Sequence, residues 1–472
     1  MKKSFVLILI FSISTTYAQE FNVNVIDGYG SGNFLVGDTV HVWAKEMNSI
    51  TTFSTWTGDT NIPGFIDEWH TSFVMPAQDI NLQAQFTTVG SLVFEYIQCS
   101  ETIKPVYHHF PSSPGGIVFL FSGNMNVWLK SPDHFQLVKD LMASNIAIVI
   151  TEAEEVTINV DIDGNGKHRW IKDVLTTNNN IDIRNIQSLI DTFENRSYIA
   201  PSIKKFAIGM SNGGAFAITV SYALSFDAAV PYCVRGNTTA ISNTSTPIQW
   251  CMAKYDDNPN VGYPAYLNTL TYSANLNSNN VCSNVYLKDK SPIYPEIFAR
   301  FPAISTSLSQ DIFNELNSFG LLDNIGNYHY MNTYSSDIIS QLNTYPILSN
   351  LNLEQLLAVS SQMDVTYAGH KFFSSHNKRT INFLFNPCSI ILPTDENGIA
   401  HYVSVYPNPA FDKINVVSDH ALNQTVLLIN SVGQLVLEDE INKPFQTIDI
   451  SSLLNGLYFL NVNGKSIKII KN

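Results

Sequence analysis

The residues best suited to chemistry are a serine, two carboxylates and a histidine in the middle of the chain. The serine lies in the segment Gly-Met-Ser-Asn-Gly, which has the pattern G-x-S-x-G with Ser211 at its centre. In this pattern a strand ends in a sharp turn, the serine takes a strained backbone conformation, and the positions two before and two after it must be small. Gly209 and Gly213 meet that requirement. The pattern predicts a nucleophilic Ser211; the alternative is a structural serine in a turn.

A nucleophilic serine requires a base that takes its proton and an acid that orients the base. On sheets that carry this turn, the acid and then the base follow the serine along the chain. Asp256 and Asp257 come shortly after an apolar, strand-like segment, 247–251. We expect Asp256 to be the acid and keep Asp257 as the alternative. The carboxylate that is not used would be a solvated loop residue.

Three histidines follow these carboxylates: His329, His370 and His376. His370 comes after Gly369, between a strand-like segment at 364–367 and a final amphipathic helix. Because the base belongs after the last strand and before the last helix, we expect His370 to be that base. His376 is expected on a solvated face near the start of the helix. His329 lies in an insertion and is a candidate for lining the substrate cleft.

An acyl-transfer site also needs two backbone N–H groups that hold the oxyanion. The amide of Asn212, directly after the serine, is the first expected donor. The second should follow the apolar strand 117–121, in the segment Ser-Gly-Asn-Met that begins at Ser122. We expect the amide of Asn124 to be this donor, with Met125 as the alternative.

The elements that must position these residues alternate between strands and helices. Apolar, β-rich runs are typical of strands buried on both faces, and amphipathic segments between them are typical of helices. The alternation predicts an α/β fold with a mostly parallel sheet flanked by helices. The expected strands are 117–121, 146–150, 206–208, 228–230 and 247–251, and the expected helices are 135–143, 183–193 and 213–223.

Residues 91–386 resemble the α/β-hydrolase esterases related to polyhydroxybutyrate depolymerases and to feruloyl and acetylxylan esterases. The resemblance rests on VFLFSGN, IDIRNIQSLIDTF, AIGMSNGGAFA and the Gly-His before the last helix. It implies cleavage of carboxylic esters, of plant-polysaccharide or polyester origin, through an acyl-enzyme on Ser211, with no cofactor. The chain departs from the family pattern at Ser122, which replaces a histidine, and in the long gap between Asp256 and His370.

That gap predicts a helical cap at about 265–350, with helical pieces at 308–316 and 338–342; a cap commonly closes over an acyl site. Two other functions stay open. A secreted peptidase uses the same triad on the same fold. A surface protein that only binds glycans is the alternative from a different class, although an intact set of Ser211, Asp256 and His370 argues against it.

The first 18 residues have the pattern of a secretory signal peptide. Two lysines precede the apolar run FVLILIFSI, and Thr-Tyr-Ala supplies a cleavage site. Residues 19–89 then alternate apolar and polar side chains between glycine-rich turns, which predicts an all-β module. GDTV, W-x-G-D and MPA-x-D-I resemble the repeat modules of bacterial surface proteins, which implies a spacer or an adhesion role.

Short alternating strands recur in 402–472, after a linker at 387–401, and predict a small β-sandwich. YPNP, NSVGQLV, LNGLYFL and the terminal KSIKIIKN resemble the C-terminal sorting domain of type IX secretion. The resemblance implies a Gram-negative source, the type IX machinery as partner, and export through the periplasm to the cell surface or medium.

Composition excludes several other classes. Lys and Arg number 26 and Asp and Glu 40, for a net charge of −14. Such a surface repels nucleic acid and anionic membranes, and outside the N-terminal segment we find no apolar stretch of the ~18 residues that a membrane helix needs. Five cysteines are too few for a disulfide scaffold and leave at least one thiol unpaired. The acidic segment 159–167, with Asp161 and Asp163, lacks the closing glutamate of a calcium loop, so we interpret it as a turn and expect no metal.

Overall fold

The structure is a computed structural model. It describes residues 19–471 except for twelve internal segments. These are 46–48, 63–64, 124–127, 259–260, 330–341, 343, 389–402, 407–408, 419–423, 432–433, 442–444 and 463–464. The expected signal peptide therefore lies outside the described residues, as do almost all of the expected linker and, except for Leu342, the expected helical piece 338–342.

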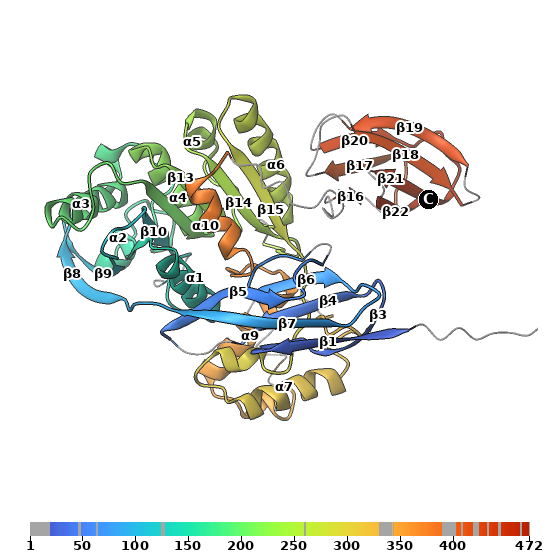
Figure 1. The fold of residues 1–472 in the computed structure, drawn as a ribbon. Helices are drawn as coiled ribbons and strands as arrows, with labels where there is room; N and C mark the ends of the chain where they lie inside the picture. The colour runs from blue at the N-terminus through green and yellow to red at the C-terminus, as the bar shows by residue number, and fades with distance from the viewer. Residues whose placement is uncertain are drawn as a thin grey trace, which may run out of the picture.

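The centre of the molecule is an eight-stranded sheet with the order β15-β14-β13-β12-β10-β11-β9-β8 (Figure 1). The strands from β10 to β15 run parallel to one another, while β9 is antiparallel to both β8 and β11. The bounds are β8 (Val93–Gln98), β9 (Ile103–His109), β10 (Ile117–Phe121), β11 (Ala147–Ile150), β12 (Lys205–Met210), β13 (Ala228–Tyr232), β14 (Ile248–Ala253) and β15 (Ser283–Lys288). The predicted α/β architecture is confirmed.

Helices cover both faces of this sheet, which explains why its strands are apolar throughout. On β10, Val118 and Leu120 belong to the core under α1 and α10, whereas Phe119 and Phe121 belong to the core under α3 and α4. Such continuous runs are what two covered faces require. The helices of this domain are α1 (Pro132–Ala143), α2 (Glu154–Ile158), α3 (Ile181–Asn195), α4 (Asn212–Leu224), α5 (Thr238–Asn243), α6 (Tyr263–Ser278) and α10 (Asn377–Phe385), with the 3₁₀ turn η1 (Thr177–Asn179).

The insertion begins later than the sequence predicts. Residues 263–288, expected in part as cap, form α6 and β15, and β15 pairs in parallel with β14 as the edge strand of the sheet. The insertion therefore follows β15. It contains η2 (Ile297–Arg300), α7 (Thr306–Ser318), η3 (Leu348–Asn350) and α9 (Leu353–Tyr367). The helical piece predicted at 308–316 is confirmed within α7.

The strand expected at 364–367 is wrong, because these residues form the last turn of α9. The helix starts at a capping box in which Asn352 accepts from the Gln355 amide and the Gln355 side chain accepts from the Asn352 amide. It ends at Ala368, whose φ of 61° is left-handed. The four residues 364–367, taken alone, did not reveal the helix cap at Asn352, which lies twelve residues before Asp364.

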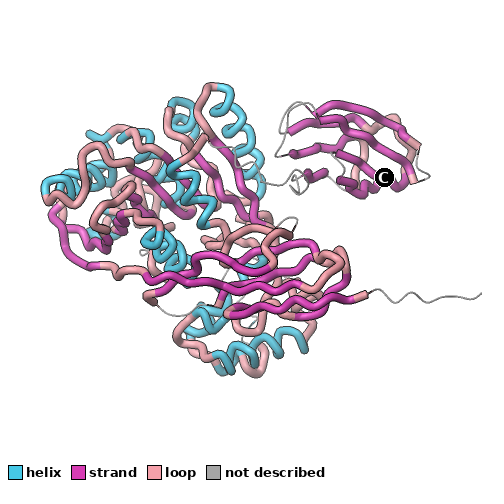
Figure 2. The backbone as a smooth tube through the Cα atoms, viewed as in Figure 1, coloured by secondary structure: helices cyan, strands magenta, loops and turns pink. Residues whose placement is uncertain are grey.

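The N-terminal module consists of two sheets, β3-β1-β7-β5 and β2-β4-β6. Its strands are β1 (Glu20–Ile26), β2 (Gly28–Tyr29), β3 (Gly32–Leu35), β4 (Thr39–Ala44), β5 (Thr51–Gly58), β6 (His70–Val74) and β7 (Ile80–Thr88). Its buried residues form one continuous core with those of the insertion, so that Trp43 and Phe73 belong to the same cluster as Phe298 and Val359. Figure 2 shows the module's strands lying next to the helices of the insertion. The module is thus packed onto the rest of the chain.

The C-terminal region is a strand-rich unit with its own core. Two sheets, β16-β17-β20 and β19-β18-β21-β22, enclose buried residues such as Ile414, Leu428 and Leu460. The strands are β16 (Val403–Tyr406), β17 (Lys413–Ser418), β18 (Gln424–Asn430), β19 (Leu435–Ile441), β20 (Phe445–Asp449), β21 (Gly456–Val462) and β22 (Lys465–Lys471).

One disulfide joins Cys282, directly before β15, to Cys388, after α10, across a sequence separation of 106. It closes a loop that contains the whole insertion and His370. The remaining cysteines, Cys99, Cys233 and Cys251, are free and buried. The sequence prediction of at least one unpaired thiol is confirmed. Within the described residues, no helix is long and apolar enough to cross a membrane.

Candidate active site

Ser211 occupies the turn between β12 and α4. Its backbone has φ 54° and ψ −119°, a region that non-glycine residues rarely adopt. The two flanking glycines make this turn possible. A Cβ on Gly209 would lie 2.2 Å from the Gly213 oxygen, and one on Gly213 would lie 2.1 Å from the Ser122 oxygen. The half-buried serine therefore projects from the carboxyl edge of the sheet, in a conformation of the kind that clusters at active sites.

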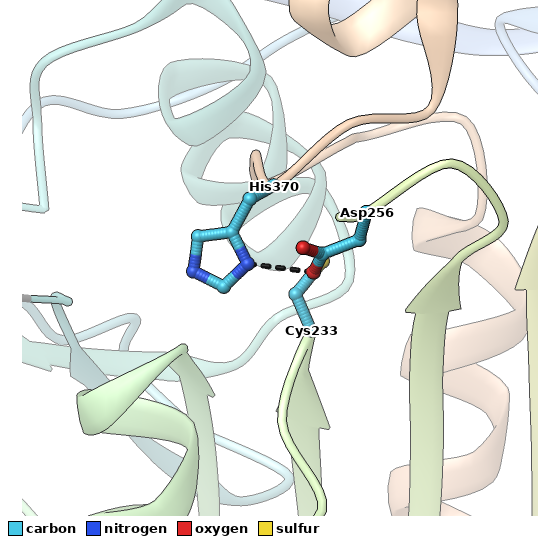
Figure 3. Close-up of side chains that lie close together, drawn as sticks. All are labelled: Cys233, Asp256 and His370. Atoms are coloured by element: carbon cyan, nitrogen blue, oxygen red, sulfur yellow. Dashed lines mark hydrogen bonds and ion pairs between the residues drawn. The ribbon is translucent and has the colours of Figure 1, made fainter. Parts of the chain in front are cut away.

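His370 and Asp256 lie beside this serine. The Nε2 atom of His370 is 3.0 Å from Ser211 Oγ, and its Nδ1 atom is 2.6 Å from Asp256 Oδ2. Figure 3 shows the imidazole directed at the carboxylate. An ionised carboxylate can only accept, so Nδ1 carries the proton and Nε2 is left to accept from the serine hydroxyl. Asp256 is buried, with its side chain 1% exposed, whereas the His370 side chain is 25% exposed.

The loops that carry Asp256 and His370 contact each other directly. The Tyr255 amide donates to the Ala368 carbonyl at 3.0 Å, and the rings of Tyr255 and Tyr367 lie 5.1 Å apart. The ammonium group of Lys290 lies 4.5 Å from the centre of the Tyr255 ring and 4.1 Å from that of Tyr367. These contacts hold the residue before Asp256 against the turn before His370. The distance between acid and base thus has structural support on both sides.

Cys233 is a neighbour of the site that sequence reasoning missed. It follows β13, and its Sγ lies in one group with Asp256 and His370, whose ligand atoms are within 4.8 Å of one another (Figure 3). The thiol donates to the Lys371 carbonyl at 3.5 Å. Burial raises the pKa of Cys233 well above its ordinary value, and the Asp256 charge adds to this. The residue is therefore a neutral thiol. The sequence signal that could have identified Cys233 is its position directly after a strand of the parallel sheet, at the sheet edge that carries Ser211.

Of the expected oxyanion donors, the structure describes Asn212 alone. Asn212 is the first residue of α4, and the amides of the first helical turn have no partner within the helix. Its side chain is fixed separately, accepting from the Trp170 amide at 3.0 Å and donating to the Trp170 carbonyl at 3.2 Å. Asn124 and Met125 lie outside the described residues.

The other candidate residues take no part in the described hydrogen bonds between Ser211, His370 and Asp256. Asp257 is exposed, and the described bond to His370 comes from Asp256. His329 is exposed on the insertion. The expectation that His376 lies on a solvated face is wrong: it is 5% exposed and stacks on Tyr286 at 3.7 Å. The start of α10 faces β15 rather than water, and burial lowers the pKa of this histidine well below its ordinary value.

The acidic segment 159–167 forms a loop against α2. Glu155 accepts from the amides of Ile162 and Asp163 at 2.8 and 3.0 Å, and Asp161 accepts from the Gly166 amide at 2.7 Å. The carboxylates of Glu155, Asp161 and Asp163 lie close together. Backbone amides thus occupy carboxylate oxygens of this loop, and the arrangement is that of a turn closed by its own acidic side chains.

Comparisons with known proteins add the following. Residues 404–472 match the family model "Secretion system C-terminal sorting domain". A segment of 67 residues is 34% identical to "Beta-agarase A" from Zobellia galactanivorans, covering 14% of this chain and 12% of that protein. The chain thus spans about an eighth of that relative's length.

Similar solved structures include a dienelactone hydrolase from Anabaena variabilis, at 14% identity and a TM-score of 0.34, covering 48% of this chain and 97% of that one. An esterase from Thermogutta terrifontis has 11% identity and a TM-score of 0.30, covering 50% of this chain and 95% of that one. An acylaminoacyl peptidase from Pyrococcus horikoshii has 9% identity and a TM-score of 0.31, covering 66% and 57%.

Two features of the chain now stand together. Its central domain has the mostly parallel sheet, the covering helices and the serine turn of an α/β-hydrolase. Its C-terminal domain directs export, with release from the cell or attachment at the outer-membrane surface. The chain is an exported protein with an α/β-hydrolase fold that ends in a type IX secretion sorting domain.

Proposed function

We propose that this protein is a secreted serine hydrolase that cleaves carboxylic esters through an acyl-enzyme. The observation that carries the proposal is the continuous hydrogen-bond relay from Ser211 through His370 to Asp256, at 3.0 and 2.6 Å. A serine in a strained turn, a base with a defined tautomer and a buried acid are the three parts that nucleophilic catalysis by serine needs.

In the proposed first step, Ser211 attacks the ester carbonyl while His370 Nε2 takes the hydroxyl proton. Asp256 keeps the Nδ1 proton in place and stabilises the imidazolium that forms. The imidazolium then gives its proton to the leaving alcohol. Water, activated by the same imidazole, attacks the acyl group, and Ser211 recovers its proton as the acid departs.

The oxyanion that forms in each step requires donors beside the serine. The Asn212 amide at the start of α4 is well suited, because it belongs to the free N–H groups of a helix N-terminus. The Asn124 amide is our proposal for the second donor. Loss of one such donor typically lowers turnover ~10²–10³-fold.

For the substrate, we propose an acyl or feruloyl ester on a polysaccharide, or a polyester, which is what the sequence resemblance implies. A peptidase would use the same relay on an amide, and a scaffold that only binds glycans would not activate the serine. The proposal therefore separates into two questions: whether Ser211 is activated, and which acyl bond it attacks.

The test is labelling of the purified mature protein with a fluorophosphonate probe, read by mass spectrometry. We expect modification of Ser211, loss of labelling in His370→Ala, and loss of ester turnover by at least ~10³-fold in Ser211→Ala, with unchanged circular dichroism. Hydrolysis of acyl p-nitrophenyl esters together with inertness toward peptide p-nitroanilides would support the esterase. A well-folded protein that does not label would overturn the mechanism.

A further inference from the structure

A cavity of about 180 Å³ lies where the N-terminal module meets the hydrolase domain. The module contributes His41 from β4 and Glu68 and His70 at the start of β6, while the hydrolase side contributes Lys288, Ser291 and Arg379. The lining comes from four separate stretches of chain. None of these residues belongs to the relay of Ser211, Asp256 and His370.

The ammonium group of Lys288 is the most unusual part of this cavity. The residue is 4% exposed. Among the described residues its hydrogen-bond partners are the Asp289 carbonyl at 3.2 Å and the Ser291 hydroxyl at 3.4 Å, and no carboxylate lies within ion-pair distance. Burying a charge without a counter-ion costs several kcal/mol, so buried ammonium groups normally have an anionic partner. Burial lowers the pKa of Lys288 to about 8, which leaves it mostly protonated at neutral pH.

Two histidines beside this lysine can add a donor. His41 Nδ1 and His70 Nε2 lie 3.2 Å apart, so one ring donates to the other. Burial lowers the pKa of His41 to about 4 and that of His70 well below its ordinary value, so both rings are neutral. A neutral pair with one mutual bond retains one free N–H group, which can donate to an oxygen.

The acidic groups at the cavity do not cancel the charge of Lys288. Burial raises the pKa of Glu68 to about 8, so its carboxyl is largely protonated at neutral pH. Asp289 also lines the cavity, but its carboxylate is exposed and lies 2.6 Å from the Lys254 ammonium group. Lys288, Lys290 and Arg379 outnumber Asp289 in the lining, so the cavity has a net positive environment. It also offers neutral N–H and O–H donors, and no carboxylate of the described residues lies within ion-pair distance of Lys288.

We propose that this cavity binds a small oxyanion, a carboxylate, sulfate or phosphate group, with Lys288 as its counter-ion. About 180 Å³ accommodates such a group with a few waters, since one water takes ~30 Å³ in the liquid. The bound anion connects β4 and β6 of the module to β15 and the start of α10. It is therefore a ligand that strengthens the contact between the module and the hydrolase domain.

The test uses the mature full-length chain, with sodium sulfate, phosphate and acetate titrated against sodium chloride at constant ionic strength. We expect saturable binding by calorimetry and a rise in the unfolding temperature that follows it. Lys288→Met should weaken the affinity at least tenfold. Lys172→Met is the matched control, because Lys172 pairs with Asp173 away from the cavity, and it should bind as the wild type does. Which salt binds most tightly distinguishes the carboxylate from the tetrahedral anions.

A second measurement keeps the proposal falsifiable if Lys288→Met does not fold. A wild-type crystal soaked in selenate should show an anomalous peak within the cavity, near Lys288 and Ser291. Absence of saturable binding by all three anions would overturn the proposal. So would a selenate difference map in which the cavity holds only water, or equal affinities in Lys288→Met and the wild type.

Discussion

Among single residues, the two glycines around Ser211 show how closely the turn that carries this serine is packed. Each approaches backbone atoms that belong to a neighbouring segment and that no side-chain rotation can move. The close approach of Gly213 to Ser122 ties the turn to the end of β10, the segment that leads to the expected oxyanion donor. A change at this position therefore affects both Ser211 and the segment expected to supply the second oxyanion donor.

Gly213→Ala is expected to destabilise the protein by at least ~2–3 kcal/mol, because the new Cβ would lie 2.1 Å from the Ser122 oxygen and 2.3 Å from the Phe121 oxygen. Urea unfolding followed by fluorescence measures the loss. Gly115→Ala is the control, since its nearest neighbours would be at 3.6 Å, an ordinary contact. Equal midpoints for both variants would contradict the close approach.

The three free thiols are expected to be unreactive in the native protein. Burial raises the pKa of Cys99 to about 11 and that of Cys251 to about 12, and it holds that of Cys233 higher than usual. Because the thiolate is the reactive form, iodoacetamide at pH 8 should modify none of them before unfolding and all of them in denaturant. Mass spectrometry counts the adducts. Rapid native labelling at Cys233 would show that solvent reaches the space behind Asp256.

Local motifs made the candidate residues predictable, and long-range packing limited what could be predicted beyond them. Ser211 is defined by five adjacent residues, and Asp256 and His370 follow from chain order. Cys233 has no motif, because it joins the group only through the parallel pairing of β13 with its neighbours. His376 was misplaced because the hydrophobic pattern of α10 does not reveal that β15 packs beside its first turn.

At the level of the elements, sequence reasoning placed α6 and β15 in the expected cap and assigned the end of α9 as a strand. β15 has only intermediate burial at most positions, since it is the edge strand of the sheet, and its apolar signal is correspondingly weak. The central strands, buried on both faces, were all found. The last helical turn of α9 alternates as a strand would, and only the upstream cap identifies it as helix.

The disulfide between Cys282 and Cys388 is expected to stabilise the folded chain, because it restricts a loop of about 100 residues in the unfolded state. The double variant Cys282→Ser, Cys388→Ser should lose ~2–5 kcal/mol in urea unfolding. Wild-type protein treated with reductant should unfold at the same urea concentration as the variant. A variant as stable as the oxidised wild type would show that the bridge does not limit unfolding.

On the scale of the whole molecule, the contact between the module and the hydrolase domain is both apolar and polar. The Glu68 carboxyl accepts from the amides of Lys378 and Arg379, at 3.2 Å each, and so caps the first turn of α10 from another domain. Trp69 donates to Ser374 at 3.0 Å, and the Lys378 ammonium donates to the Ser54 carbonyl. The domain that carries His370 is therefore bound to the module at its last helix.

This contact is expected to weaken as the pH rises. Glu68 has an ordinary pKa of 4.5, and burial raises it to about 8 in the fold despite the lowering effects of Arg379 and the two amides. Between pH 4.5 and 8 the Glu68 carboxyl is protonated in the native state and ionised in the unfolded state. The free energy of unfolding therefore falls by up to ~1.4 kcal/mol per pH unit as the pH rises. The stabilisation from protonated Glu68 is fully present below pH 4.5 and is lost as the pH rises through about 8.

Glu68→Gln removes this proton linkage. Unfolding curves of both proteins between pH 4.5 and 8 should therefore show the variant gaining stability relative to the wild type as the pH rises. Buried carboxyls without a charge effect from Glu68, such as Asp182, remain in both proteins and cancel in the comparison. A stability difference that does not change with pH would mean that Glu68 keeps its ordinary pKa in the folded protein.

The core shared between the module and the insertion also constrains the order in which the parts of the chain can fold. The module is synthesised first, yet Trp69 bonds to Ser374, a partner 305 residues later, and Trp43 and Phe73 share one buried cluster with Phe298 and Val359. Until those residues emerge, the module carries an uncovered apolar face, which is the kind of surface that chaperones bind and that drives aggregation. Interrupted synthesis thus leaves a fragment with an exposed apolar face that is prone to aggregate, rather than a fully folded first domain.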